Sequence, residues 1–153
     1  MIKLTNVTKI YKTGVRALNN MNLTIEPGEF VYVIGSTGAG KSTFIKLLYR
    51  EEKATTGKVE VVGQDVSKIK NSKVPYFRRN IGVVFQNFRL LPKKTVFENV
   101  AFALEVIDTP RVEIRRRVRA TLELVGLEDK VNSFPHELSG GQQQRVAIAR
   151  AIV

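Results

Sequence analysis

Residues 35–42 read Gly-Ser-Thr-Gly-Ala-Gly-Lys-Ser, and this glycine-rich segment with its flanks indicates the fold class. It matches in full the pattern G-x-x-x-x-G-K-[ST], in which glycines bend a loop around phosphate groups. Residues 30–34, just before it, form a continuous apolar run that is typical of a parallel strand covered on both faces. Residues 42–50, just after it, carry apolar side chains at helical spacing. A glycine-rich loop between a buried strand and a helix predicts an α/β fold with a phosphate site.

Each residue type in this loop has a reason in the chemistry of phosphate binding. Glycines let the backbone N–H groups point inward at phosphate oxygens, and the following helix adds the positive end of its dipole. The ammonium of Lys41 would neutralise the β- and γ-phosphates, and the hydroxyl of Ser42 would hold Mg²⁺. A chance glycine-rich turn is the alternative, and the readable strand and helix argue against it. The expected nucleotide contacts are Gly35, Ser36, Thr37, Gly38, Ala39, Gly40, Lys41, Ser42 and Thr43.

Composition excludes several other classes of protein. The chain has 153 residues, 25 Lys and Arg against 14 Asp and Glu, a formal net charge of +11, and no cysteine. Without cysteine there is no disulfide framework, no thiolate zinc site and no thiol catalysis, and a reducing compartment is favoured. No run approaches the roughly 20 apolar residues that cross a bilayer. The basic balance suits nucleic acid, anionic lipid, an acidic partner or nucleotide phosphates, and charge alone does not choose among them.

Hydrophobic periodicity divides the chain into two parts. The first part alternates as strands and contains short apolar runs, and its first two strands are expected to pair antiparallel. From residue 95 onward the apolar residues recur at helical spacing instead. The strands are expected at residues 1–8, 21–25, 30–34, 58–62 and 81–85, and the later helices at 97–107, 112–125 and 139–153. This pattern predicts one domain, with an α/β part at 1–86 and a helical part at 87–153.

A second motif stands far downstream of the loop. Residues 138–145 read Leu-Ser-Gly-Gly-Gln-Gln-Gln-Arg, and Ser139 and Gln142 have the spacing of a capping box that opens a helix. Capping does not explain Gly140 and Gly141, because glycine weakens a helix by roughly 1 kcal/mol relative to alanine. Bare N–H groups, a helix dipole and a hydroxyl would make a second anion-binding surface here. One nucleotide does not easily need two such surfaces from one subunit.

With both motifs the chain resembles the ATP-binding-cassette (ABC) ATPases, whose signature is Leu-Ser-Gly-Gly-Gln. The resemblance covers the whole chain. It implies an α/β P-loop NTPase of the ABC nucleotide-binding-domain type, with an antiparallel β part, a partial RecA-like core and a helical subdomain, incomplete at the C-terminus. In this family the signature of one protomer closes over the ATP held by the P-loop of another, which implies ATP, Mg²⁺ and a head-to-tail homodimer. The expected signature contacts are Ser139, Gly140, Gly141 and Gln142.

The resemblance also assigns roles outside the two motifs. Gln86 matches the family's Q-loop glutamine, which helps ligate Mg²⁺, senses the γ-phosphate and links to a membrane partner. The implied Mg²⁺ ligands are therefore Ser42 and Gln86. Tyr11 resembles the aromatic residue that stacks on adenine, and its alternative is a half-buried tyrosine at a strand end. His136 precedes the signature, whereas the family's switch histidine lies far downstream, so we interpret it as a surface residue.

Several segments resemble the cell-division branch of the family more than other branches. They are residues 48–50, 74–75, 78–79, 81–86, 90–96, 98–100 and 134–139. This implies an ATPase on the cytoplasmic face of the membrane, paired with an integral membrane protein through a groove wall at 87–94, with no specific nucleic acid. The alternatives are the ATPase of a lipoprotein-release or macrolide-export transporter and, more distantly, a DNA-repair ABC ATPase. The last class usually inserts coiled coils or zinc modules between the motifs, and this chain has an uninterrupted interval without cysteine.

The family's hydrolytic residues are expected beyond the printed sequence. Family members carry the Walker B aspartate, the adjoining glutamate and the switch histidine after the signature helix, and none of these lies within the 153 residues. No catalytic residue is therefore expected in this chain. We expect nucleotide binding with negligible hydrolysis. We also expect self-association, because a parallel sheet without its central strand leaves backbone groups and apolar surface unpaired.

Overall fold

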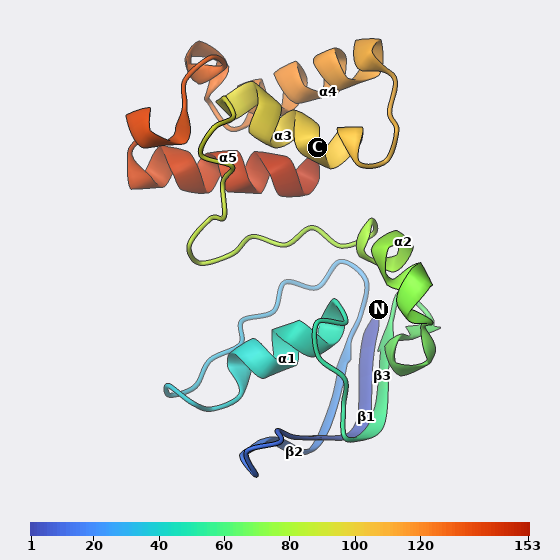
Figure 1. The fold of residues 1–153 in the computed structure, drawn as a ribbon. Helices are drawn as coiled ribbons and strands as arrows, with labels where there is room; N and C mark the ends of the chain where they lie inside the picture. The colour runs from blue at the N-terminus through green and yellow to red at the C-terminus, as the bar shows by residue number, and fades with distance from the viewer. The chain divides into compact units, whose positions relative to one another are not determined.

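A computed structural model describes every residue from Met1 to Val153 (Figure 1). The chain forms two compact units, Met1–Asn80 and Ile81–Val153. The division falls at residue 80, within the segment that the periodicity assigned to the α/β part. Each unit has its own buried residues and is described by itself.

The first unit is built on a four-stranded antiparallel sheet with the strand order β2-β1-β3-β4. Leu4 on the inner strand lies opposite Leu23 on one neighbour and Val59 on the other, and Leu4 and Val59 are buried. The expected antiparallel pairing of the first two strands is confirmed. The strands are β1 (Ile2–Ile10), β2 (Arg16–Ile25), β3 (Thr56–Val61) and β4 (Gln64–Asp65).

One helix of this unit, α1 (Lys41–Leu48), packs against β2 and β3 (Figure 1). Its buried face contains Phe44 and Leu47, as the helical spacing predicted. Arg78 donates from Nε to the carbonyl of Tyr49 and from Nη2 to that of Arg50, at 2.9 and 3.2 Å. These bonds place the positive charge of Arg78 on the carbonyl groups just after α1. The charge stabilises the negative end of the helix dipole. The remaining helical segments are η1 (Val66–Lys68), η2 (Asn71–Lys73) and α2 (Val74–Arg78).

Two apolar runs that were expected to be buried strands form no strand. Residues 30–34 and 81–85 have no partner in the sheet, and the side chains of Phe30, Tyr32 and Ile34 are 81%, 79% and 89% exposed. A strand exists through ladder hydrogen bonds to a neighbour, and apolar composition alone supplies none. The prediction of a parallel strand at 30–34 and of a strand at 81–85 is therefore wrong for this chain. The sheet that does form is entirely antiparallel.

The second unit is a group of packed helices (Figure 1). Its core includes Val100, Leu104, Val118, Leu122 and Val146, all nearly or fully buried. These residues repeat at the helical spacing seen in the sequence, so the predicted apolar stripes are confirmed. The helices are α3 (Val96–Glu105), α4 (Arg111–Leu124), η3 (Glu128–Lys130), η4 (Pro135–Glu137) and α5 (Gly140–Ile152). None of the helices combines the length and apolar character that a membrane span requires.

Capping boxes fix where two of these helices begin. Ser139 Oγ accepts a hydrogen bond from Gln142 N–H at 3.3 Å, and Gln142 Oε1 accepts one from Ser139 N–H at 2.8 Å. The capping box expected at α5 is thus confirmed. Thr95 and Glu98 make the same pair of bonds at α3. Hydrogen bonds from the N–H and hydroxyl of Thr95 hold the pKa of the Glu98 carboxyl below its ordinary value.

One polar side chain lies in the core of the helical unit. Asn99 is fully buried, and its Nδ2 donates to the carbonyl groups of Leu91, Lys94 and Thr95 at 3.1, 2.9 and 2.9 Å. Its Oδ1 accepts from the N–H of Leu91 at 2.7 Å. Buried polar groups are stable only with partners, and here one amide satisfies four backbone groups. Asn99 therefore holds residues 91–95 against the start of α3.

We expect Asn99→Ala to lower the free energy of unfolding by about 2 kcal/mol, because backbone groups of residues 91–95 lose their partner. Asn99→Asp keeps an acceptor for Leu91 N–H but directs a carboxylate oxygen at carbonyl groups, so its loss should be larger. Denaturant unfolding measures both. The matched control is Asn132→Ala at an exposed position, with an expected change within about 0.5 kcal/mol. If Asn99→Asp and Asn132→Ala changed the free energy of unfolding equally, the role of Asn99 in holding residues 91–95 would be contradicted.

Candidate functional site

The loop at residues 35–42 leads into α1 with unpaired backbone donors. Gly40, the N-cap, has a left-handed backbone with φ of 86°, and no side chain caps the helix. The first hydrogen bond of the helix runs from Phe44 N–H to the carbonyl of Gly40, at 2.8 Å. The N–H groups of residues 41–43 therefore have no partner within the helix. They lie at the positive end of the helix dipole, where an anion is bound most readily.

The side chain of Lys41 turns back across the same loop. Its Nζ donates to the carbonyl of Gly35 at 2.6 Å and to that of Ser36 at 2.7 Å. The cation is thus held at the beginning of the loop, while the free N–H groups lie at its end. The loop offers positive charge and hydrogen-bond donors together, which is what a polyphosphate requires.

Gly40 also marks a close approach between α1 and the sheet. A Cβ atom at this position would overlap the carbonyl oxygen of Ala17 on β2. Gly38 shares the left-handed conformation, with φ of 87°, but faces open space. Glycine at position 40 is therefore required twice, by the backbone angle and by the packing of the loop on the strand.

A hollow of about 330 Å³ opens beside the loop. Tyr11, expected at the adenine, lines this hollow, and its hydroxyl lies 3.0 Å from Oγ1 of Thr43. The ammonium of Lys9 lies 5.0 Å from the centre of the tyrosine ring. The structure therefore brings Tyr11 and the loop together. The residues around the hollow are Tyr11, Val15, Ala17, Thr37, Gly38, Gly40, Lys41, Ser42 and Thr43.

Sequence reasoning missed two residues of this hollow, Val15 and Ala17. Val15 lies in the turn between β1 and β2, and 59% of its surface is exposed. The sequence offers no signal for either residue beyond the short distance between Val15 and Tyr11 along the chain. Both residues give the hollow apolar surface close to the ring of Tyr11.

The start of α5 is a second set of unpaired donors. Ser139 caps the N–H of Gln142, and the N–H groups of Gly140 and Gly141 make no hydrogen bond within the chain. Apart from adjacent residues and the backbone of the helix itself, no atom lies within 4 Å of where a Cβ of either glycine would stand, and both residues are exposed. Packing inside the chain therefore does not require these glycines. Their effect is to keep the positive end of the helix bare.

Gln86 lies exposed in a turn that follows the apolar run at 81–85. The turn is closed by a hydrogen bond from Phe88 N–H to the carbonyl of Phe85, at 2.9 Å. Arg150 of α5 donates to the carbonyl groups of Phe88 and Arg89, at 2.7 and 2.8 Å. Burial lowers the pKa of the Arg150 guanidinium from its ordinary value. No sequence pattern predicts this contact, because an arginine late in a helix is usually solvated.

The expected site residues fall into two groups. Tyr11 and the loop at 35–43 belong to the first unit, whereas Gln86 and the signature at 139–142 belong to the second. Within each unit the structure positions these residues as described above. Nowhere do three His, Asp or Glu side chains gather as metal ligands. His136 is exposed, as expected, and stacks on Phe134 with ring centres 5.9 Å apart.

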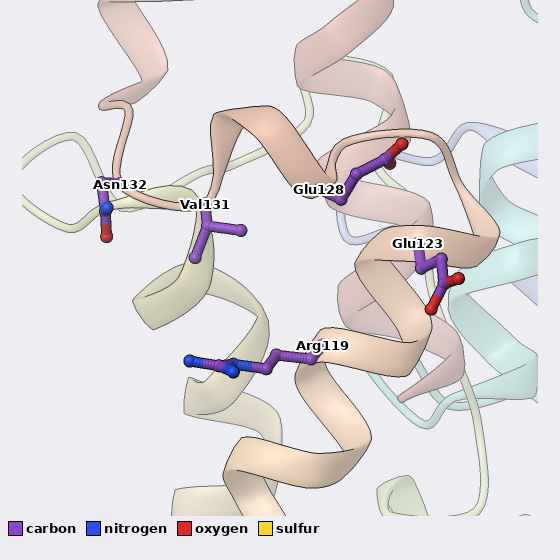
Figure 2. Close-up of a pocket in the computed structure, with 5 residues that line it drawn as sticks. All are labelled: Arg119, Glu123, Glu128, Val131 and Asn132. Atoms are coloured by element: carbon purple, nitrogen blue, oxygen red, sulfur yellow. The ribbon is translucent and has the colours of Figure 1, made fainter.

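A larger hollow, of about 580 Å³, lies beside α4 and η3. Figure 2 shows that Arg119 points away from the carboxylates of Glu123 and Glu128, which themselves diverge. These side chains do not converge on a common point where a ligand would be held. The hollow at the loop is therefore the stronger candidate site, despite its smaller size.

Comparisons with known proteins agree on one family. A family model described as "ABC transporter" matches residues 18–153. The cell division ATP-binding protein FtsE of Bacillus subtilis (strain 168) is 58% identical over 153 residues, which are 100% of this chain and 67% of that protein. The methionine import ATP-binding protein MetN 1 of Salmonella typhimurium is 51% identical over 155 aligned positions, covering 99% of this chain and 45% of that protein. The chain thus spans about two thirds of the FtsE relative and less than half of the MetN relative.

Solved structures are similar over nearly the whole chain. The dimeric structure of MJ0796, a bacterial ABC transporter cassette, has a TM-score of 0.90 and 42% identity, covering 99% of this chain and 69% of that chain. The structure of CbiO1 from Clostridium perfringens, part of an ABC transporter complex, has a TM-score of 0.89 and 30% identity, covering 99% and 60%. A further structure of the first cassette is a dimer bound to ADP and Pi, with a TM-score of 0.88.

The two glycines of the loop are expected to respond differently to alanine. Gly38→Ala should lower the free energy of unfolding by about 1 kcal/mol, the cost of a left-handed backbone with a Cβ. Gly40→Ala adds the overlap with Ala17, so we expect a further loss of about 1–3 kcal/mol. Denaturant unfolding of both variants measures the difference. Equal losses would show that the contact between α1 and β2 is not as close as described.

Proposed function

The chain belongs to the ABC transporter family and has the fold of its nucleotide-binding domain, and on this premise we propose that it is the ATP-binding part of an FtsE-like cell-division ATPase. The proposal is carried by one observation, that two helices begin with unpaired N–H groups. One helix follows the phosphate-binding loop, and the other begins within the signature. Similarity to FtsE proteins over the whole chain supports the choice of branch.

ATP binds, in this proposal, along the loop and the hollow beside it. The free N–H groups of residues 41–43 and the ammonium of Lys41 hold the β- and γ-phosphates, and the ring of Tyr11 stacks on the adenine. Ser42, through its exposed hydroxyl, and Gln86, through its amide oxygen, are the residues that would each offer an oxygen ligand to Mg²⁺. When bound there, Mg²⁺ would supply positive charge against the phosphate oxygens.

The second helix start acts on a nucleotide held by another copy. In a head-to-tail homodimer, Ser139, Gly140, Gly141 and Gln142 of one protomer close over the triphosphate held at the P-loop of its partner. The open space at both glycines supports this arrangement, since a side chain there would stand between the N–H groups and a phosphate. The relative with a TM-score of 0.90 was solved as a dimer.

Coupling to a membrane is the remaining part of the proposal. The full-length ATPase lies on the cytoplasmic face and pairs with an FtsX-like integral membrane protein, and ATP binding and hydrolysis signal to that partner. Residues 87–94 form the docking wall, because they mix partly buried Phe88, Leu90 and Leu91 with basic residues. No specific nucleic acid is involved. Residues 1–153 by themselves bind nucleotide and hydrolyse it negligibly, because the family's hydrolytic carboxylates are not among them.

An importer ATPase is the second candidate, favoured by the 51% identity to the methionine import protein MetN 1. The membrane protein that copurifies with the natural protein distinguishes the two. A partner encoded beside a cell-division gene supports the first candidate, and a permease with a substrate-binding protein supports the second.

Two substitutions are expected to separate binding from assembly. Lys41→Ala should weaken MgATP binding by about tenfold or more, since one charged hydrogen-bond donor to phosphate is lost. Gly141→Asp should leave MgATP binding by a single copy within about twofold, because the altered helix start faces another copy, yet abolish ATP-dependent dimerisation. Nucleotide titration and sedimentation of the natural protein measure the two effects. Undiminished dimerisation by Gly141→Asp would contradict the proposal.

A further inference from the structure

The last turn of α5 contacts the segment around Gln86 on both sides of that residue. On one side, a Cβ at Gly82 would overlap the carbonyl oxygen of Ala151, so the backbone of the 81–85 run lies directly against the helix. On the other side, the guanidinium of Arg150 donates to the carbonyl groups of Phe88 and Arg89. Gln86 thus lies between two contacts with α5, one at Ala151 and one at Arg150.

The bond to Arg150 stabilises a backbone that is unfavourable by itself. Phe88 and Arg89 both have positive φ, 55° and 48°, and left-handed conformations are costly for residues with a side chain. Two consecutive residues of this kind turn two successive carbonyl groups toward the helix. A planar guanidinium with several N–H groups is suited to hold both oxygens, which a lysine ammonium would match less well. Partial burial of Arg150 strengthens these bonds, because less water competes for them.

The turn is also closed on itself. Phe88 N–H donates to the carbonyl of Phe85, and the guanidinium of Arg89 lies 4.1 Å from the centre of the Phe85 ring. Residues 85–89 therefore form one small unit that Arg150 fastens to α5. Displacement of this unit relative to the helix requires that both bonds to Arg150 break.

The opposite end of α5 is the signature. The helix has 13 residues, a length of about 20 Å at the ordinary rise per residue, and it has no proline. Val146, Ala147 and Ala149 are fully buried along it. A continuous helix held by a buried face transmits a displacement with little bending. The last turn of α5 thus contacts the segment that contains Gln86, and its first turn contains Gly140 and Gly141.

We propose that Arg150 is a positioning residue that makes Gln86 and the signature, residues 139–142, move as one rigid body. A displacement of Gln86 at the nucleotide held by its own chain then shifts the bare helix start that faces the nucleotide of another copy. The inference rests on the proposed function for the roles of Gln86 and the signature. The link itself is a property of this chain and is testable without nucleotide.

Arg145 supplies a matched control on the same helix. Its Nη1 also donates to two consecutive backbone carbonyl groups, those of Val125 and Gly126, at 2.9 and 3.1 Å. These bonds tie α5 to the end of α4 and not to the turn at Gln86. Arg145→Gln therefore removes the same chemistry from a different segment.

Residues 1–153 contain no cysteine that would compete with a label placed at a chosen position among them. Nitroxides at Asn87→Cys and Gln144→Cys, both exposed, report the distance between the turn and the middle of α5 in the natural protein. We expect a narrow distance distribution in the parent and in Arg145→Gln, and a clearly broader one in Arg150→Gln. Arg150→Lys should fall between them. Thermal unfolding establishes that each variant is folded, and a distribution in Arg150→Gln as narrow as the parent's would overturn the proposal.

Adding MgATP tests the functional half of the inference. The distance in the parent should stay unchanged, and a shift on nucleotide binding would overturn the rigid body. Arg150→Gln should weaken ATP-dependent dimerisation by about tenfold, a usual size for coupling between two sites, while single-copy MgATP binding is retained. If Arg150→Gln dimerised as strongly as Arg145→Gln, the proposed coupling between Gln86 and the signature would be overturned. If the parent binds no MgATP, the proposed function fails, and the nucleotide-free distances still decide the role of Arg150.

Discussion

The site depends on the unpaired N–H groups at the starts of two helices, α1 and α5. Every helix leaves its first N–H groups without intrahelical partners, and most proteins satisfy some of them with a capping side chain. At α1 the N-cap is Gly40 and no side chain helps. At α5 the cap from Ser139 satisfies Gln142 and leaves both glycines bare. Phosphate oxygens are suitable partners for donors at both places.

Two separate cores hold these helix starts in position. The buried face of α1 lies against the antiparallel sheet through Phe44 and Leu47. The buried face of α5 belongs to the helical core, which α3 and α4 complete. Polar side chains, and not apolar ones, hold the connecting segments in place. Asn99 holds residues 91–95, and Arg150 holds residues 88–89. These two segments therefore depend on a few directional bonds.

The sequence predicted the parts of this structure that are determined locally. The loop at 35–42 and the capping box at Ser139 are encoded in consecutive residues, and helical spacing identified the buried stripes of the second unit. Strands at 30–34 and 81–85 were wrongly expected, because a strand needs a neighbour that its own residues do not specify. Asn99, Arg150 and Val15 went unnoticed for a related reason. Their roles depend on burial and on backbone groups distant in the sequence.

Mixing two defective copies of the natural protein tests most directly whether the two helix starts meet across a dimer. A Lys41→Ala copy retains its signature, and a Gly141→Asp copy retains its P-loop, so a mixed dimer contains one intact composite site. We expect MgATP to assemble dimers in the mixture, whereas neither variant assembles alone and a copy carrying both changes rescues neither. A mixture of folded variants that stays monomeric with MgATP, while the unaltered protein dimerises, would contradict it.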